Sequence, residues 1–259
     1  MMDLYNYSLL TSFLVGLAVI LCASEIGRRI GVLHIGGPGS ESVSVLESAI
    51  LGLLALMIGF TFAMALSRFE ARRDAVLNEA NAIGTTALRA RLLPDPHRTE
   101  TLKLLREYVK IRLDITQRPV SQTELTAAID RSNTLQEALW QQAKAMAAKD
   151  SGMVPTGLFI QTLNEMIDNQ GKRLAAVLNR VPSIVLLALF GVAAIANAFA
   201  GYASGLEACR RRLPVYITGL LIAAVIFLIL DLDRPGAGFI AVSQQPMIDT
   251  AASIAGFAD

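Results

Sequence analysis

The residues in this sequence that are best placed to do chemistry are two carboxylates and a group of arginines. Asp231 and Asp233 follow the apolar run LLIAAVIFLIL, and Arg68, Arg72 and Arg73 follow the apolar run GFTFAMAL. If each run is a helix, the two carboxylates lie at a helix C-terminus, where the helix dipole disfavours negative charge. Positive charge from the arginines would compensate for this, so the two helix ends are expected to lie together.

The sequence therefore predicts a charge-paired collar where two membrane helices leave the bilayer on the same side. In this collar the arginines pair with Asp231 and Asp233, and Arg234 pairs with Glu79. The expected members are Arg68, Arg72, Arg73, Glu79, Asn81, Asp231, Asp233 and Arg234. A structural version of the hypothesis has the collar fix the helix ends. A functional version adds that the collar forms a mouth through which an ion passes, and both versions are open at this point.

The elements that must position these side chains are membrane helices. The chain has 259 residues, of which 53% are hydrophobic and 17% charged, and its mean hydropathy is +0.49. Soluble domains carry about 25% charged residues. Long apolar runs of the length that spans a bilayer occur at Leu9 to Ala23, Val45 to Leu66, Pro182 to Tyr202 and Pro214 to Leu230. The first run has no basic residues before it, which favours a retained helix over a signal peptide.

These runs predict an all-α, multi-pass membrane protein in which two helical hairpins flank a helical extramembrane domain. The expected boundaries are 1–66 for the first hairpin, 67–181 for the extramembrane domain, 182–231 for the second hairpin and 232–259 for a C-terminal tail. The Lys and Arg residues near the membrane ends do not decide which side of the membrane carries the extramembrane domain. The flanks of the first helix favour one orientation, and the count over the whole chain favours the other.

The extramembrane domain is expected to be helical throughout. Its first helix continues from the second membrane helix and ends before Pro94 and Pro96. A second helix is amphipathic, Arg118-Pro119 breaks it, and Ser121 to Glu124 has the form of a capping box that opens a third. A last helix carries apolar residues from Ile160 to Val181 at nearly heptad spacing, which suits packing against a neighbouring helix.

Two of the membrane helices carry stripes of small residues. On the second helix the stripe consists of Ser48, Gly52, Ala55, Gly59 and Ala63. On the third it consists of Gly191, Ala194, Ala198, Gly201 and Gly205. Small faces allow helix backbones to approach closely in a bilayer. One interpretation is tight packing inside a single subunit; the other is that the second helix packs around a symmetry axis and lines a pore. Asn197, within the third helix, is expected to make an interhelical hydrogen bond or to line the pore.

Several function classes receive no support from the sequence. The net charge of +1 gives no electrostatic basis for binding nucleic acid. The sequence has no G-x-S-x-G or H-E-x-x-H motif, so we do not expect an enzyme. Its two cysteines, Cys22 and Cys209, form no CxxC pair and have no neighbouring histidine cluster. We therefore expect neither a metal site nor a cofactor.

Three separated blocks of sequence resemble a known family. They are GFTFAMALSRFEARRDAVLNEANAIGTTALRARLLP, LLREYVKIRLD and FLILDLDRPGAGFIAVS. In order and spacing they look like the bestrophin-like domain family of bacterial membrane proteins, over roughly residues 45 to 250. The resemblance implies that ten residues occupy motif positions of the family: Glu79, Asn81, Arg89, Arg106, Glu107, Tyr108, Asp231, Asp233, Arg234 and Pro235.

The resemblance also implies an architecture and a function. Bestrophins are pentameric anion channels in which four membrane helices and a cytoplasmic helical domain surround a pore lined by the second helix. This sequence has no aromatic constriction on its second helix beyond Phe60 and Phe62, and DLDRP is no counterpart of an acidic calcium-binding clasp.

Two functional hypotheses follow. The first is a homo-oligomeric ion channel, a pentamer by analogy, in the bacterial inner membrane, with the lipid bilayer and an inorganic ion as its partners. The alternative is a non-conducting membrane scaffold or envelope sensor whose helical insert binds a partner.

Overall fold

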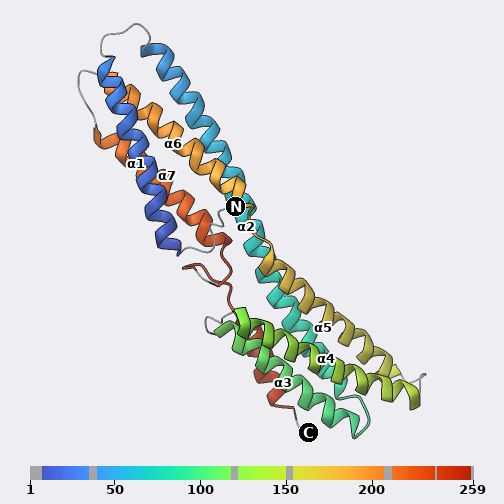
Figure 1. Cartoon of the computed structure of the whole chain (residues 1–259). Coiled ribbons are helices and arrows are strands. Elements are labelled where there is room, and N and C mark those ends of the chain that lie inside the picture. Colours follow the sequence, from blue (N-terminus) through green and yellow to red (C-terminus); the bar gives the residue numbers. More distant parts are fainter. Residues whose placement is uncertain are drawn as a thin grey trace. The chain divides into compact units, whose positions relative to one another are not determined.

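The regular structure of the described residues is entirely helical, which confirms the all-α prediction. The computed structural model describes residues 8–34, 40–117, 122–149, 154–206, 212–236 and 238–257. Eight helices lie in these ranges: α1 (Leu9–Leu33), α2 (Ser40–Ala90), α3 (His97–Gln117), α4 (Gln122–Lys149), α5 (Val154–Leu178), α6 (Ser183–Leu206), α7 (Arg212–Asp233) and α8 (Gln245–Ala255) (Figure 1).

Four helical stretches are long and apolar enough to cross a membrane: Leu9–Leu33, Val43–Ala90, Val154–Leu206 and Arg212–Asp233. They contain the four spans predicted from the sequence. The predicted breaker at Arg118-Pro119, the capping residue Ser121 and Cys209 lie outside the described residues.

The chain divides into two compact units. We call residues 1–68 and 180–240 the membrane unit, and residues 69–179 and 241–259 the insert unit. Helix α2 contributes residues to both, because it runs without a break from Ser40 to Ala90. The predicted boundary at 66/67 lies close to the first division between the units.

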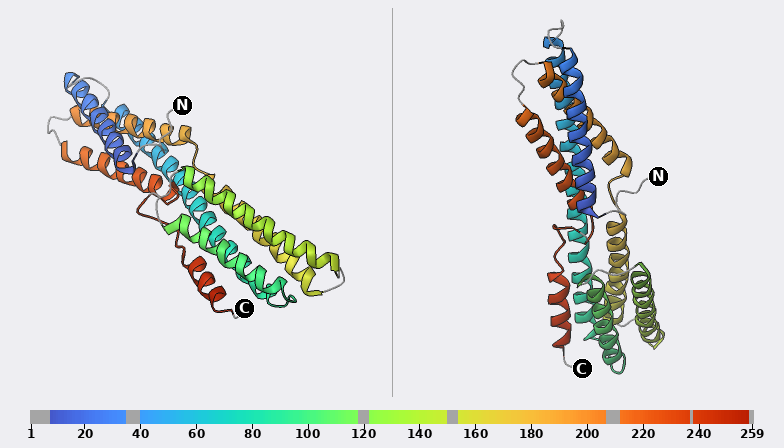
Figure 2. Two further views of the ribbon diagram at one scale, coloured as in Figure 1. Left: turned by 60° about the horizontal axis from the view of Figure 1, so that its bottom comes forward. Right: turned by 60° about the vertical axis from the view of Figure 1, so that its left-hand side comes forward.

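In the membrane unit, α1 packs against α6 and α7, and α6 packs against α7 (Figure 2). Glycines allow the closest approach. A Cβ at Gly27 of α1 would overlap the Ala198 carbonyl of α6, and a Cβ at Gly201 of α6 would overlap the Ser24 carbonyl of α1. Gly31 and Gly205 repeat this relation about one turn further along. Backbone-to-backbone contact of this kind is how small residues associate helices in lipid.

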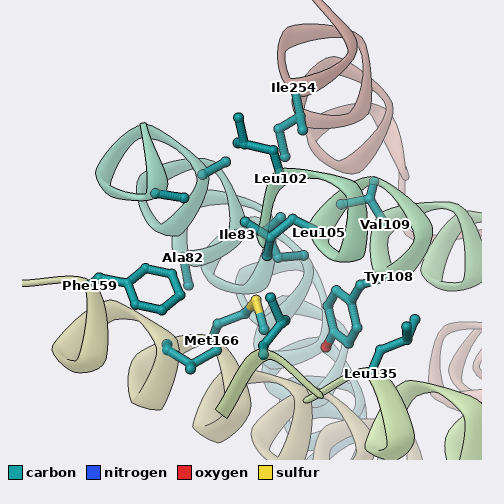
Figure 3. Close-up of a cluster of buried hydrophobic side chains, with 14 of the residues drawn as sticks. Ala82, Ile83, Leu102, Leu105, Tyr108, Val109, Leu135, Phe159, Met166 and Ile254 are labelled. Atoms are coloured by element: carbon teal, nitrogen blue, oxygen red, sulfur yellow. The ribbon is translucent and has the colours of Figure 1, made fainter. Parts of the chain in front are cut away.

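In the insert unit, one hydrophobic core draws on α2, α3, α4, α5 and α8. Figure 3 shows Ile83, Leu105, Tyr108, Leu135 and Met166 converging on its centre. Helix α2 ends at Ala90, shortly before the prolines that predicted its end.

Helix α8 is an element that the sequence predicted only as tail. It packs against α3 through Met247 and Ile254, which are both almost fully buried. Arg106 of α3 donates to the carbonyls of Ile254 and Phe257, at 3.4 and 2.6 Å, so a cation lies where the α8 dipole is negative.

Candidate functional site

The stripe of small residues on α2 is exposed along its whole length. Ser48, Gly52, Ala55, Gly59 and Ala63 are all exposed. A Cβ built at Gly52 or Gly59 meets no described atom within 4 Å. The opposite face of α2 is covered, since Leu54, Thr61 and Ala65 are buried. Among the described residues of one chain, therefore, the α2 stripe is not a helix-packing surface.

The similar stripe on α6 behaves differently. Gly201 and Gly205 are buried against α1, with the backbone approach described above, whereas Gly191 at the other end has no described atom near its Cβ position. Packing inside one subunit thus accounts for the part of the α6 stripe nearest its C-terminus.

Asn197 of α6 lies in the same packed region, at 1% exposure. Its Nδ2 donates to the Ala193 carbonyl of its own helix at 2.9 Å. This hydrogen bond is within α6, whereas the sequence predicted one between helices. The Oδ1 atom lies instead toward Gly219 of α7, where an added Cβ would come within 3.1 Å of it. The small Gly219 is what lets α7 approach the buried amide.

The two carboxylates at the end of α7 are buried and bind backbone N–H groups. Asp231 is 2% exposed and accepts from Phe239 N at 2.7 Å and Ile240 N at 3.0 Å. Asp233 is fully buried and accepts from Val181 N, just before α6, at 2.9 Å. These charge-assisted bonds offset the unfavourable position of the carboxylates at a helix C-terminus.

Gly238 explains how the segment after α7 approaches so closely. A Cβ at this position would overlap the Asp231 carboxylate. Arg234, also buried, donates from Nη2 to Ser12 Oγ of α1 at 3.4 Å. Asp233 and Arg234 therefore connect the end of α7 to the beginnings of α6 and α1 within the membrane unit.

The other expected collar residues lie on α2. Arg68 is half-buried and donates to the Met64 carbonyl at 3.5 Å. Arg72 is buried, while Arg73 and Asn81 are exposed. Arg68 belongs to the membrane unit, and its pairing with the α7 carboxylates stays a prediction. The pairing of Arg72 and Arg73 with these carboxylates also stays a prediction, because such contacts would join the two units.

Glu79 is the centre of a buried polar cluster in the insert unit. It is fully buried, and its carboxylate accepts from Arg112 Nε at 2.7 Å and from Arg173 Nη1 at 2.6 Å. Arg112 Nη2 adds a second contact at 3.3 Å. The sequence predicted Arg234 as the partner of Glu79, whereas the described contacts are with arginines of α3 and α5.

The cluster continues through Tyr108, whose hydroxyl donates to Gln170 Oε1 at 2.6 Å and lies 3.3 Å from Glu79 Oε1. Gln136 Nε2 also donates to Gln170, at 2.5 Å. Burial, with the neighbouring Glu79 charge, raises the pKa of Tyr108 well above its usual range. The hydroxyl therefore stays protonated and available as a donor.

Arg173 extends the cluster toward α8, because its Nη2 donates to Gln244 Oε1 at 2.9 Å. The sequence reasoning missed Arg112, Arg173, Gln136, Gln170 and Gln244. One signal was available: Phe159, Leu163 and Met166 follow a helical spacing that continues onto Gln170 and Arg173. Polar residues at core positions are usually hydrogen-bonded to one another.

Neither the α7 carboxylates nor the cluster around Glu79 has the composition of a metal centre. No group of three or more His, Cys, Asp or Glu side chains gathers among the described residues. The geometry provides an exposed small-residue helix face in the membrane unit and a buried, charge-paired cluster in the insert unit.

Comparison with known proteins gives consistent results. A family model for the Bestrophin-like domain matches residues 34–247. No curated protein matches the chain. The crystal structure of a bacterial bestrophin homologue from Klebsiella pneumoniae is similar with a TM-score of 0.64 at 15% identity, covering 95% of this chain and 98% of that one. A single-substitution variant of that homologue gives a TM-score of 0.67 at 14% identity, with 96% and 99% covered. Identity at this level shows a shared fold.

Proposed function

Because the chain belongs to the Bestrophin-like family, we propose that it forms an oligomeric ion channel in the bacterial inner membrane, lined by α2. The observation that carries the proposal is the exposed stripe from Ser48 to Ala63. A lipid-facing helix surface has no need of successive glycines and alanines, whereas small residues suit a face that meets copies of itself around an axis.

Lining by a single helix per subunit also sets a lower limit on the number of subunits. If each subunit contributes one helix to the lining, about four or more subunits are needed to leave a lumen, and the family resemblance suggests five, arranged around an anion path. The polar cluster around Glu79 supports the proposal in a second way, since a rigid insert unit would hold the extramembrane part of α2 in a defined position.

The alternative is a non-conducting scaffold or sensor whose insert unit binds a partner. It is favoured by one observation: the insert unit has a hydrophobic core of its own. Such a protein has no need of a closed ring of subunits and can act as a monomer or dimer.

Oligomer mass and ion flux together separate the two functions. The mass of the detergent-solubilised particle, corrected for bound detergent, should correspond to four or more copies. Liposomes containing the protein should then release chloride faster than empty liposomes. A monomer or dimer, or a ring of subunits without flux of any tested anion or cation, would contradict the channel proposal.

A further inference from the structure

A groove lies between α3 and α8 in the insert unit, away from the polar cluster. Its volume is about 290 Å³. The floor is apolar and consists of Val109 and Leu113 of α3 with Ala251, Ile254 and Ala255 of α8. Figure 3 shows Val109 and Ile254 on the two helices that form its walls.

The rim of the groove is charged and belongs to α3. Arg106, Lys110 and Asp114 follow one another at intervals of one helical turn. Arg106 is held in place by the α8 carbonyls that accept its hydrogen bonds. Lys110 is exposed and makes no side-chain hydrogen bond or ion pair within the described part of the chain. The rim therefore carries a net charge of +1, with Arg106 at one end, Asp114 at the other and Lys110 between them.

We propose that this groove binds an amphipathic monocarboxylate. The carboxylate lies against Arg106 and Lys110, and its acyl chain covers Leu113, Ala251 and Ala255, the more accessible apolar residues of the lining. One negative charge neutralises the rim, whereas a phosphate dianion would leave negative charge beside Asp114. A volume of 290 Å³ holds roughly ten water-sized groups, which is the size of an eight-carbon carboxylate.

Binding has a consequence for α8, because the two walls of the groove come from different helices. A ligand that contacts both walls must leave before α8 can separate from α3. By mass action, the opening of α8 is then suppressed by the factor 1 + [L]/Kd, which is about tenfold at a ligand concentration ten times Kd.

The test uses the full-length protein in lipid nanodiscs and a diazirine derivative of octanoic acid as the probe. After photolysis, peptide mass spectrometry should find the label within 109–114 and 251–255, and unlabelled octanoate should compete for it. Lys110→Gln should lower this labelling at least fivefold. Lys103→Gln, which changes an exposed lysine of the same helix that lies outside the groove, should leave it unchanged.

Two controls keep the result interpretable. The matching diazirine octanol, which is neutral, should label the groove weakly and independently of Lys110. Ala251→Phe should fill the groove and abolish labelling, while hydrogen exchange of the α8 amides shows that the helix is still docked. Labelling confined to the membrane helices, or groove labelling that is equal for acid and alcohol and insensitive to Lys110→Gln, would overturn the proposal.

Discussion

At the scale of single residues, buried charge is the most informative feature of this protein. Glu79 lies between two arginines from helices that are distant in sequence, and Asp231 and Asp233 bind backbone N–H groups. For Glu79 and Asp231 the burial of the carboxylate is offset by more than one donor at once, and for Asp233 it is offset by the Val181 N–H. Removing one partner of such a group costs more than the intact interaction contributes, because the remaining charge stays buried and unpaired.

Glu79→Gln should therefore destabilise the insert unit strongly. The change keeps the shape of the side chain but leaves the guanidinium groups of Arg112 and Arg173 without their carboxylate. Breaking a buried pair costs about 3–5 kcal/mol, so the melting temperature of the purified protein should fall by several degrees.

The matched control is Glu70→Gln, the same change on an exposed position of the same helix. Surface changes of this kind usually alter stability by less than about 0.5 kcal/mol. Equal melting temperatures for the two variants would show that the Glu79 cluster does not hold the insert unit together.

The raised pKa of Tyr108 predicts a dependence on pH at the alkaline end. Below a pH of about 10, the pKa of an unperturbed tyrosine, the hydroxyl is protonated in both the folded and the unfolded chain. Above that pH the unfolded chain loses this proton and the folded chain retains it, so stability should fall as pH rises.

Tyr108→Phe provides the test of this dependence. The variant should be less stable than the wild type at neutral pH by about 1–3 kcal/mol, because Gln170 and Glu79 lose a buried donor. It should also show a shallower loss of stability above a pH of about 10. Parallel pH profiles for the two proteins would rule out the contribution of Tyr108.

At the scale of elements, the two small-residue stripes show that similar sequences have different roles. Part of the α6 stripe is buried against α1, whereas the α2 stripe is exposed and its two glycines have no described atom within 4 Å of their Cβ positions. The sequence suggested both roles for small residues and could not assign them, because burial depends on which helices become neighbours.

A leucine on the α2 stripe should reduce ion flux. Under the proposed function, Gly59→Leu places a large side chain in every subunit toward the lumen, and we expect flux in liposomes to fall at least tenfold with the oligomer intact. Gly191→Leu is the matched control, since Gly191 also lies on an apolar helix with no described atom within 4 Å of its Cβ position. Flux reduced equally by both variants would count against lining by α2.

Gly201→Leu should act on folding, because its side chain would displace the Ser24 backbone of α1. Overpacking of this type costs about 1–3 kcal/mol or more. We expect a lower yield of monodisperse protein by size-exclusion chromatography than for Gly191→Leu. Similar yields for the two variants would indicate that α1 and α6 do not need to approach so closely.

At the scale of the whole molecule, the fold class and the four membrane helices were predictable, because apolar runs of spanning length leave few alternatives. Helix α8 was missed because only Met247 and Ile254 are buried on it, so its apolar pattern is too sparse to stand out. The partners of Glu79 were missed for a different reason: they come from α3 and α5, and contacts between distant helices are not encoded in local spacing.

The hydrogen bond between Asp233 and Val181 has a consequence for how the protein is made. Its two partners are 52 residues apart, and Val181 is synthesised first. At about 5–20 residues per second, the ribosome needs several seconds to produce the carboxylate that the Val181 N–H binds. Throughout that interval the Val181 N–H lacks its final acceptor. The second hairpin is thus completed only when α7 has been translated to its last residue, and Phe239 and Ile240, whose N–H groups bind Asp231, are made after it.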